Sequence, residues 1–490
     1  MKKIIPVIDV FAGPGGLGEG FSSTEGKKLR FRIALSVEKD TDACETLRIR
    51  SAYHLLAPKK KKQYIEWLEG TPSTESFKSF FPKEYAEAEE TVLQMIMGKD
   101  PDETLDKKIE QIVDQNRNWI LVGGPPCQAY SIMGRVKNSS KDGYTPEGDE
   151  RFELYRQYKR IVENYKPAVF LMENVVGILT AKLNNKLVIE DIIAVLEKAG
   201  YKLYSLVKPS LIDGMPVPRD FVIEAERFGV PQMRHRVIVL GIRKDLDVKP
   251  ALLEEAKVQV SVQQALSGFP CLRSHISRNT DENKDWKEII KKITEQPWFS
   301  EIEEPVRKVM EKNLGNLNAD GTGVWKQCTE TVPCVQWCSQ NAPASPVQHE
   351  SRSHIYQDLW RYFFAACYTE EHGVSPKLDK YPKGLLPNHE NAGSGNFGDR
   401  FRVQVSGRPS TTITSHISKD GHYYIHPDAK QCRSLTVREA ARLQTFPDNY
   451  FFSGNRTSQY HQVGNAVPPY LAHQIAEIVL RLFEEIDGHC

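Results

Sequence analysis

The sequence predicts an α/β protein, built on a doubly wound sheet and carrying a second, smaller domain. Two observations lead to this prediction. In the first half of the chain, four short apolar runs alternate with helical patterns. From about residue 250 to residue 400 this alternation fades, while proline, asparagine and glycine become more frequent.

The four apolar runs indicate buried parallel strands, because each is short, apolar on both sides and ended by polar or breaking residues. They span residues 7–11, 32–37, 119–123 and 168–172. Helical patterns at 154–163 and 188–198 complete the alternation. Ligands bind beyond the carboxyl ends of the strands in such sheets, and all four runs carry their unusual residues at that end.

At 490 residues the chain is long enough for two or three domains. We expect a first domain over residues 1–250, a second over 251–457, and a segment, 458–490, that returns to the first. A helix at 286–295 stands alone in the second domain, and an amphipathic helix at 471–485 ends the chain.

A polar stretch at residues 54–117 interrupts the first domain as an insertion or an elaborated crossover, with a helix expected at 86–96. It contains four consecutive lysines, 59–62. A charge run of this kind is typical of a solvated loop, which is the favoured interpretation; contact with phosphate is the alternative.

Composition excludes several classes of protein. Lys plus Arg total 65 and Asp plus Glu total 64, so the net charge of +1 excludes a histone-like polycation or an acidic disordered tail, but not a basic cleft for nucleic acid. The sequence contains no run of roughly 18 apolar residues, so no membrane span is predicted. The first apolar residues are expected to form a core strand, not a signal peptide. The nine cysteines, odd in number and irregularly spaced, are typical of a reduced intracellular protein.

A glycine loop follows the first strand. Gly13, Gly15 and Gly18 match the pattern G-x-G-x-x-G, and Glu38 follows about 20 residues later, after the second strand. Glycines let a cofactor approach the backbone, and a carboxylate accepts hydrogen bonds from ribose. Pro14 removes one amide donor, which weakens a pyrophosphate cradle. The loop alone is therefore compatible with a dinucleotide and with S-adenosylmethionine, which has no phosphate.

Cys127 follows the third strand through the stiff exit Gly123-Gly-Pro-Pro. The two prolines would hold Cys127 at the carboxyl edge of the sheet, a position that a structural cysteine does not need. We therefore interpret Cys127 as a nucleophile, and a nearby positive charge would stabilise its thiolate. The next residues, to about Thr145, are rich in Gly, Ser, Asn and Lys, the composition of a mobile loop that closes over a substrate.

Polar residues follow two further strands. Glu173 ends the fourth run, where it suits hydrogen bonding to a ring nitrogen; a salt bridge or a helix-capping contact is the structural alternative. Gln232, Arg234 and Arg236 alternate into an apolar run at 237–241 and should share one face. That face would form a cationic wall for an anionic or carbonyl-rich ligand and would support a thiolate.

Six phrases resemble, in their order along the chain, those of the DNA cytosine-C5 methyltransferases. They are residues 9–16 (DVFAGPGG), 124–128 (GPPCQ), 172–175 (MENV), 232–236 (Gln-x-Arg-x-Arg), 433–448 and 462–469. The resemblance covers residues 7–245 and 405–480, apart from the insertion. The resemblance implies an S-adenosylmethionine-dependent, Rossmann-like methyltransferase sheet with a small target-recognition domain. The alternative hypothesis of a dinucleotide-binding enzyme does not explain the last four phrases.

The resemblance implies roles for the matching residues. Cys127 would be the nucleophile, Glu173 would contact the cytosine ring nitrogen and amino group, Arg236 the base carbonyl, and Arg234 and Gln232 would complete the catalytic set. The cofactor would be held by Phe11, Gly13, Gly15, Glu38, Pro126, Leu154, Asn465 and Val467. The family's Gly-Asp-Ile contact to adenine has no clear counterpart before Cys127, and Asp106 is the acid considered for it.

The resemblance further implies base flipping in double-stranded DNA, a bacterial cytoplasmic location, a monomer, and a separate restriction endonuclease that cuts the same site. RNA cytosine methylation and a catalytically silent DNA-binding regulator are the alternatives. Residues 250–400 would read the DNA sequence. Cys328, Cys334 and Cys338 lack a C-x-x-C pair, so no metal is expected. Arg438, Glu439 and Arg442, neighbours on one helix face, are expected to brace the two lobes.

Overall fold

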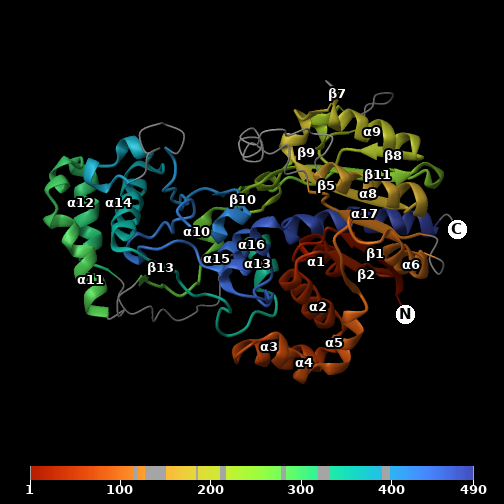
Figure 1. Cartoon of the computed structure of the whole chain (residues 1–490), viewed down its shortest axis with the longest axis horizontal. Coiled ribbons are helices and arrows are strands. Elements are labelled where there is room, and N and C mark those ends of the chain that lie inside the picture. Colours follow the sequence, from red (N-terminus) through yellow and green to blue (C-terminus); the bar gives the residue numbers. More distant parts are fainter. Residues whose placement is uncertain are drawn as a thin grey trace.

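The computed structural model describes residues 2–113, 118–126, 150–183, 186–209, 217–277, 283–317, 331–388 and 398–488. Cys127, the loop expected to follow it, and Cys328 lie outside these residues. The described chain forms two lobes, with the sheet in one and a helical group around α12 and α14 in the other (Figure 1). Segments near the C-terminus, coloured blue, lie between them.

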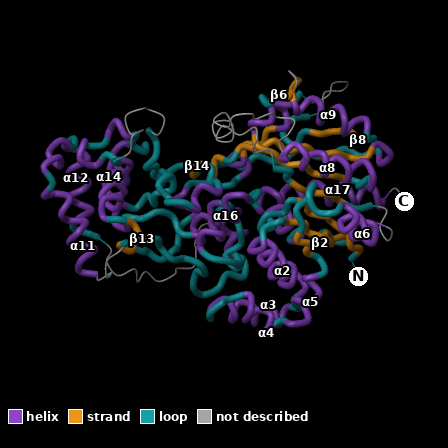
Figure 2. Tube along the Cα trace, viewed as in Figure 1, coloured by secondary structure: helices purple, strands orange, loops and turns teal. Residues whose placement is uncertain are grey.

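One eight-stranded sheet organises the larger lobe, with seven strands in the order β3-β2-β1-β4-β5-β11-β8 and β9 paired to β11 (Figure 2). The strands are β1 (Lys3–Val10), β2 (Leu29–Glu38), β3 (Val92–Gln94), β4 (Ile120–Gly123), β5 (Val169–Val175), β8 (Tyr201–Tyr204), β9 (Val222–Glu224) and β11 (His235–Arg243). The four strands expected from the sequence are β1, β2, β4 and β5, and they pair in parallel as predicted. β11 is antiparallel to β5.

Helices cover both faces of this sheet, as a doubly wound fold requires. On one face lie α1 (Gly16–Ser22) and α17 (Pro469–Gly488), whose apolar side chains share a core with alternate residues of β1 and β2. On the other lie α6 (Asp102–Val113), α8 (Glu150–Tyr165) and α9 (Val188–Lys198). The predicted helices at 154–163, 188–198 and 471–485 are thereby confirmed.

The insertion differs from its prediction. The helix expected at 86–96 is wrong, because α5 (Pro82–Glu89) ends early and β3 follows it as an edge strand. The four lysines do not form a loop; they lie in α3 (Pro58–Glu69), which begins with a proline at its first turn. Buried aromatic residues hold α3, α4 (Thr74–Phe80) and α5 against the end of α2 (Thr41–Leu55) and against Val347 and Phe451.

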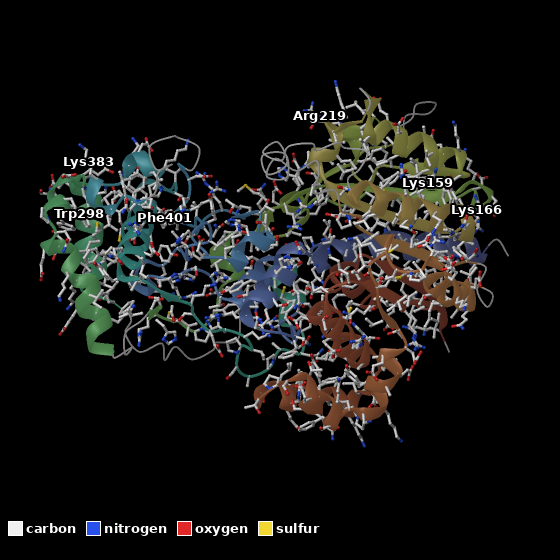
Figure 3. The ribbon with its side chains drawn as sticks, in the orientation of Figure 1. Lys159, Lys166, Arg219, Trp298, Lys383 and Phe401 are labelled. Atoms are coloured by element: carbon white, nitrogen blue, oxygen red, sulfur yellow. The ribbon has the colours of Figure 1, made fainter. Side chains whose placement is uncertain are left out.

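A separate hydrophobic core holds the smaller lobe together. It joins α11 (Asn283–Lys291), α12 (Glu304–Leu314) and α14 (Tyr356–His372), which confirms helical structure at 286–295. Trp298 and Phe401 belong to this core and lie on the same side of the molecule in Figure 3. Short pairs complete the described strands: β6 (Lys182–Leu183) with β7 (Lys186–Leu187), and β12 (His275–Ile276) with β13 (Ser353–His354).

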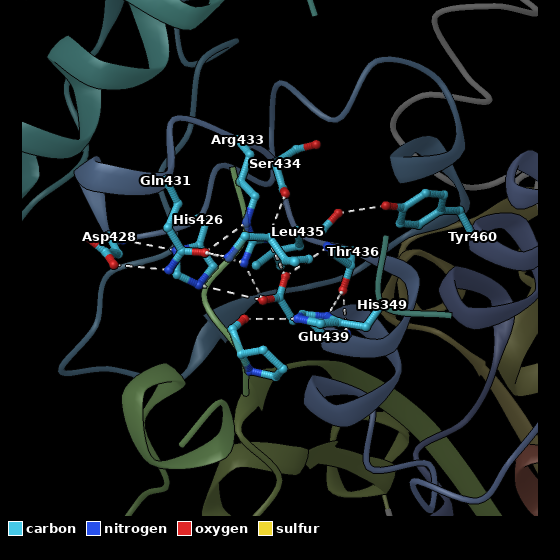
Figure 4. Close-up of polar contacts among 12 residues, drawn as sticks. His349, His426, Asp428, Gln431, Arg433, Ser434, Leu435, Thr436, Glu439 and Tyr460 are labelled. Carbon is cyan, nitrogen blue, oxygen red and sulfur yellow. Dashed lines mark hydrogen bonds and ion pairs between the residues drawn. The ribbon is translucent and has the colours of Figure 1, made fainter. Parts of the chain in front are cut away.

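The joint between the lobes is built from α10 (Val262–Ala265), α13 (Pro333–Ser339), α15 (Val437–Leu443), α16 (Arg456–Asn465) and the pair β10 (Gln232–Met233) with β14 (Ser410–Thr411). The Thr436 hydroxyl caps α15 by accepting from the Glu439 amide, and the Glu439 carboxylate accepts from the Thr436 amide. Glu439 also pairs with Arg433, both fully buried, at 2.6 Å (Figure 4). Arg438 donates to the carbonyls of Val347 and Pro447. These contacts are those of a brace.

Three histidines in and beside this joint predict acid sensitivity. Burial lowers the pKa of His349 and of His426 to about 4, and that of His354 to about 3. The pKa of each histidine lies below the usual value of 6.5 in the folded protein. The stability that each neutral histidine contributes is therefore complete above pH 6.5 and is lost as the pH falls towards 4. We expect roughly 2 kcal/mol of unfolding free energy to be lost per histidine between pH 7.5 and pH 5.

Urea unfolding at both pH values measures this loss. His426→Gln should flatten the pH dependence by one histidine's share, whereas the same change at the exposed His461 should leave it intact. An unfolding free energy that does not fall between pH 7.5 and pH 5 would contradict the prediction.

Gly16 carries a second prediction, because α1 meets the entry to α17 there. A Cβ atom on Gly16 would lie 2.1 Å from the carbonyl oxygen of Val467, and backbone cannot move aside cheaply. Gly16→Ala should therefore lower the unfolding free energy by about 1–3 kcal/mol. Gly407→Ala is the matched control, since a Cβ there meets nothing within 4 Å. Equal thermal midpoints for the two variants would refute the close contact.

Candidate active site

The glycine loop is a left-handed bend closed by Glu38. Phe11, Gly13 and Gly15 have φ angles of 56°, 55° and 91°, a region that costs a non-glycine residue such as Phe11 free energy. Glu38 holds the bend from the next strand, because its Oε2 accepts a hydrogen bond of 2.8 Å from the Gly13 amide. Its Oε1 accepts from the amides of Lys39 and Asp40. The loop and the acid predicted to act together are therefore in contact.

The C-terminal segment closes over this loop. The hydroxyl of Tyr450 donates to the Pro14 carbonyl, and the Val467 backbone lies against Gly16. The Asn465 side chain is exposed and contacts His461 one turn earlier. Residues 450–467 thus reach a loop that lies more than 400 residues earlier in the chain.

The other predicted cofactor residues line the same edge of the sheet. Leu154 on α8 and Phe11 both pack, partly buried, against the core cluster beneath β1 and β4. Pro126 follows the end of β4. A Cβ atom on Gly13 would meet nothing within 4 Å, so there is open space beside the loop.

Sequence reasoning missed Asp9, which lies beneath the loop in β1. Its side chain is 1% exposed. Burial raises the pKa of Asp9 to about 8, with the Gly18 amide opposing the rise and the charge of Glu38 adding to it. The carboxyl is therefore mostly uncharged at neutral pH. Asp9 begins the first phrase of the family resemblance, but its place inside an apolar strand gave no sign that its carboxyl would be buried beside the loop.

Asp106, the acid considered for the adenine contact, is engaged by another residue. It is on α6, where both carboxylate oxygens pair with Arg160 of α8 at 2.7 and 2.8 Å. The insertion contains the edge strand β3, with Gln94 opposite Glu38. The loop after β3, with Ile96 exposed, lies at that sheet edge. The Arg160 pair therefore leaves the adenine contact expected of Asp106 without support.

Glu173 and Arg236 form the centre of the polar edge. Arg236 Nε lies 2.9 Å from Glu173 Oε1, and each side chain is 14% exposed. Burial lowers the pKa of Arg236 from its usual value, and the nearby Glu173 charge opposes that change. The other Glu173 oxygen lies against Gly124, where a Cβ would approach it to 2.7 Å. The carboxylate thus sits directly beside the backbone that leads to Cys127.

Asn174 fixes that backbone. Its Nδ2 donates to the Pro125 carbonyl at 3.1 Å, and its Oδ1 accepts from the Val175 amide. The residue is buried, so its amide has a fixed orientation. Two consecutive residues of β5 therefore contact the Gly124-Pro-Pro exit of β4, one through a carboxylate and one through an amide.

Gln232 and Arg234 share a buried face with Arg236, as the alternation predicted, but they do not join it in a ligand-facing wall. Gln232 is 0% exposed; its amide donates to Leu443 and Gln444 and accepts from the Ile413 amide. Arg234 donates to the Ile413 carbonyl at 2.8 Å. The expectation of one cationic wall is wrong, because the joint between the lobes uses the polar atoms of both residues.

No group of three His, Cys, Asp or Glu side chains within the described ranges could hold a metal ion. Cys334 and Cys338 are buried on α13, and burial raises the pKa of Cys338 well above its usual value. They are core cysteines. Within the same ranges, no helix is long and apolar enough to cross a membrane.

Comparison with known proteins agrees with this geometry. Residues 68–481 match the family model for C-5 cytosine-specific DNA methylases. The type II methyltransferase M.Bpa9945I of Bacillus paralicheniformis is 34% identical over 99% of both chains. The type II methyltransferase M.AgeI of Thalassovita gelatinovora is 26% identical over 96% of this chain and 98% of its own.

A solved structure shares the fold. It is a DNA modification methyltransferase from a prophage of E. coli, with a TM-score of 0.56, 18% identity and coverage of 98% of this chain and 99% of that chain. The family match spans well over half of the chain, and the first relative exceeds 30% identity along nearly all of it. The chain belongs to the C-5 cytosine-specific DNA methylase family.

Proposed function

We propose that this protein transfers a methyl group from S-adenosylmethionine to carbon 5 of a cytosine in a specific sequence of duplex DNA. The observation that carries the proposal is the Glu173–Arg236 pair, held at the carboxyl edge of the sheet against the Gly124-Pro-Pro exit that leads to Cys127. A Glu173 carboxyl that donates to nitrogen 3 and accepts from the amino group, beside a guanidinium that donates to the carbonyl oxygen, matches the hydrogen-bonding edge of a cytosine ring.

The cofactor fits the loop at the ends of β1 and β2. The open space beside Gly13 admits a ligand close to the backbone, and Glu38 lies where a ribose would follow. We assign to this site Phe11, Gly13, Gly15, Glu38, Pro126, Leu154, Asn465 and Val467. We place the adenine contact on the loop after β3, near Ile96. When bound, S-adenosylmethionine supplies an electrophilic methyl group on a sulfonium.

The protein's own residues make carbon 5 reactive. The Cys127 thiolate bonds to carbon 6 of the cytosine as nitrogen 3 takes a proton from the Glu173 carboxyl, which leaves an enamine whose carbon 5 is nucleophilic. The Glu173 carboxylate then accepts hydrogen bonds from nitrogen 3 and the amino group, and Arg236 donates to the carbonyl oxygen, so both stabilise the added ring. After carbon 5 takes the methyl group, a base removes its proton, and the returning electron pair expels the Cys127 sulfur.

The target carbon is inside the base stack, so the cytosine must leave the helix, at a cost of roughly a few kcal/mol. We assign DNA reading to residues 251–457, with catalysis in 1–250 and in the returning segment 458–490. Arg234 and Gln232 act by fixing the joint between these parts. The relatives' type II names support a role beside a separate restriction endonuclease, and we infer a cytoplasmic monomer.

Base-resolution mapping of methylcytosine, after incubation with mixed-sequence DNA and labelled cofactor, tests the proposal. We expect methylation of carbon 5 in one short sequence. Cys127→Ser and Glu173→Gln should each lower the rate at least 100-fold, because each removes a group that acts on the ring. Lys166→Gln, at an exposed end of α8, should keep the wild-type rate.

Cofactor binding by the two slow variants, measured by calorimetry, should match the wild type, which excludes misfolding as the cause. Substantial turnover by Cys127→Ser would remove Cys127 as the nucleophile. Methyl transfer to RNA in preference to duplex DNA would show that the substrate is RNA and not duplex DNA.

A further inference from the structure

A cavity of about 550 Å³ lies behind the glycine loop, away from the Glu173–Arg236 pair. Its walls come from α1, β2, α2, the start of α3, α13, residues 447–450 and α17. It includes Gly15 and Gly18 but none of Phe11, Glu38, Pro126, Leu154, Asn465 or Val467. The cavity therefore adjoins the proposed cofactor site at Gly15 but contains none of those six residues, and its volume is typical of small-molecule sites.

Part of the lining is a complete, buried ion network. Arg50 donates from Nε and Nη2 to the two oxygens of Glu19, at 2.7 and 2.5 Å, and from Nη1 to Asn449 at 2.9 Å. His54 Nε2 lies 2.9 Å from Glu19 Oε2. Burial alone would raise the pKa of Glu19, but the charges and hydrogen bonds of Arg50 and His54 outweigh this rise. The pKa therefore lies below its usual value, and Glu19 stays ionised. Its charge is already neutralised by Arg50.

The remaining charges of the lining do not balance. Arg32 pairs with Glu87, and Glu25 pairs with Lys2. Arg30 and Lys61 also line the cavity, and neither forms an ion pair with a carboxylate of the described residues. The cavity wall therefore carries two cations, Arg30 and Lys61, that form no ion pair within the described residues, although the charges of Glu19 and Glu25 act on Lys61.

Lys61 is held at this wall by the fold. Its ammonium lies 4.9 Å from the centroid of the Tyr53 ring, whose other cationic neighbour, Arg50, lies 4.1 Å away. Burial, and then the charge of Arg50, lower the pKa of Lys61, while the charges of Glu19 and Glu25 oppose this change only in part. An anion beside Lys61 would relieve both effects, because it would replace lost solvation and oppose the Arg50 charge.

Neutral parts of the lining suit an organic ligand. Trp337 and His473 stack with ring centroids 4.6 Å apart, and both line the cavity. Ser22 and Gln340 add hydrogen-bonding groups to the same lining. A phosphate group carries close to two negative charges at pH 7, which matches the two cations of the wall that form no ion pair.

We propose that this cavity binds a phosphorylated small molecule of nucleotide size, with its phosphates on Lys61 and Arg30. The lysine run of the sequence then has a binding role through Lys61, the member that lines the cavity. The site is independent of the methyl-transfer proposal, because it shares no reacting group with Cys127, Glu173 or Arg236.

Equilibrium dialysis of the full-length protein with ADP tests this inference, with S-adenosylhomocysteine present in excess to occupy the cofactor site. We expect one saturable ADP site, and no binding of adenosine, which lacks the phosphates. Lys61→Ala should weaken ADP binding at least tenfold. Lys62→Ala is the matched control, on the same helix but exposed and outside the lining, and should bind as the wild type.

Three results would overturn the inference: no saturable binding of ADP to the wild type, equal affinity of Lys61→Ala and wild type, or displacement of ADP by S-adenosylhomocysteine. Thermal midpoints of the two lysine variants should agree, which separates lost contacts from lost folding. Because the readout is binding, a failure here leaves the methyl-transfer assignment unaffected, and a failure of methyl transfer leaves this measurement valid.

Discussion

The antiparallel register of β5 and β11 is the constraint on which the active site depends. Ile238 lies opposite Glu173, so Arg236, two residues earlier, becomes the diagonal neighbour of Glu173 on the same face. A shift of one residue would send one of the two side chains to the opposite face of the sheet. The parallel pairing of β4 with β5 then brings Gly124 against the carboxylate. Backbone pairing, more than any single side chain, thus assembles the catalytic edge.

The same strand, β11, also connects the two lobes. Arg236 faces the reacting edge, whereas Gln232 and Arg234, just before it, bind Ile413, Leu443 and Gln444 from the C-terminal half. Their polar atoms are buried, so an unpaired group there would cost about 1–3 kcal/mol. The smaller lobe is therefore held in a fixed orientation relative to Glu173, as the DNA-reading role that we propose for it requires. Gln232 and Arg234, which the resemblance implies are catalytic, contact the joint between the lobes.

Local patterns predicted the parts of the molecule whose partners are near in sequence or lie at strand ends. The four parallel strands and the shared site of Gly13 and Glu38 were accessible in this way, whereas the common site of Glu173 and Arg236 was implied only by the family resemblance. The three-residue strand β3 could not be predicted, because it is too short to show an alternating pattern within the polar insertion that surrounds it. The burial of Gln232 depends on residues about 180–210 positions away, which no local pattern records. The helical lysine run was missed because Tyr64, Trp67 and Leu68, which anchor α3, were not weighed together with it.

The covalent role of Cys127 can be measured by trapping the reaction on duplex DNA that carries 5-fluorocytosine, because fluorine at carbon 5 cannot leave as a proton does. We expect a stable protein–DNA adduct that forms only with S-adenosylmethionine, and peptide mass spectrometry should place the bond on Cys127. An adduct on another residue, or no adduct from enzyme that methylates ordinary cytosine, would show that Cys127 is not the nucleophile.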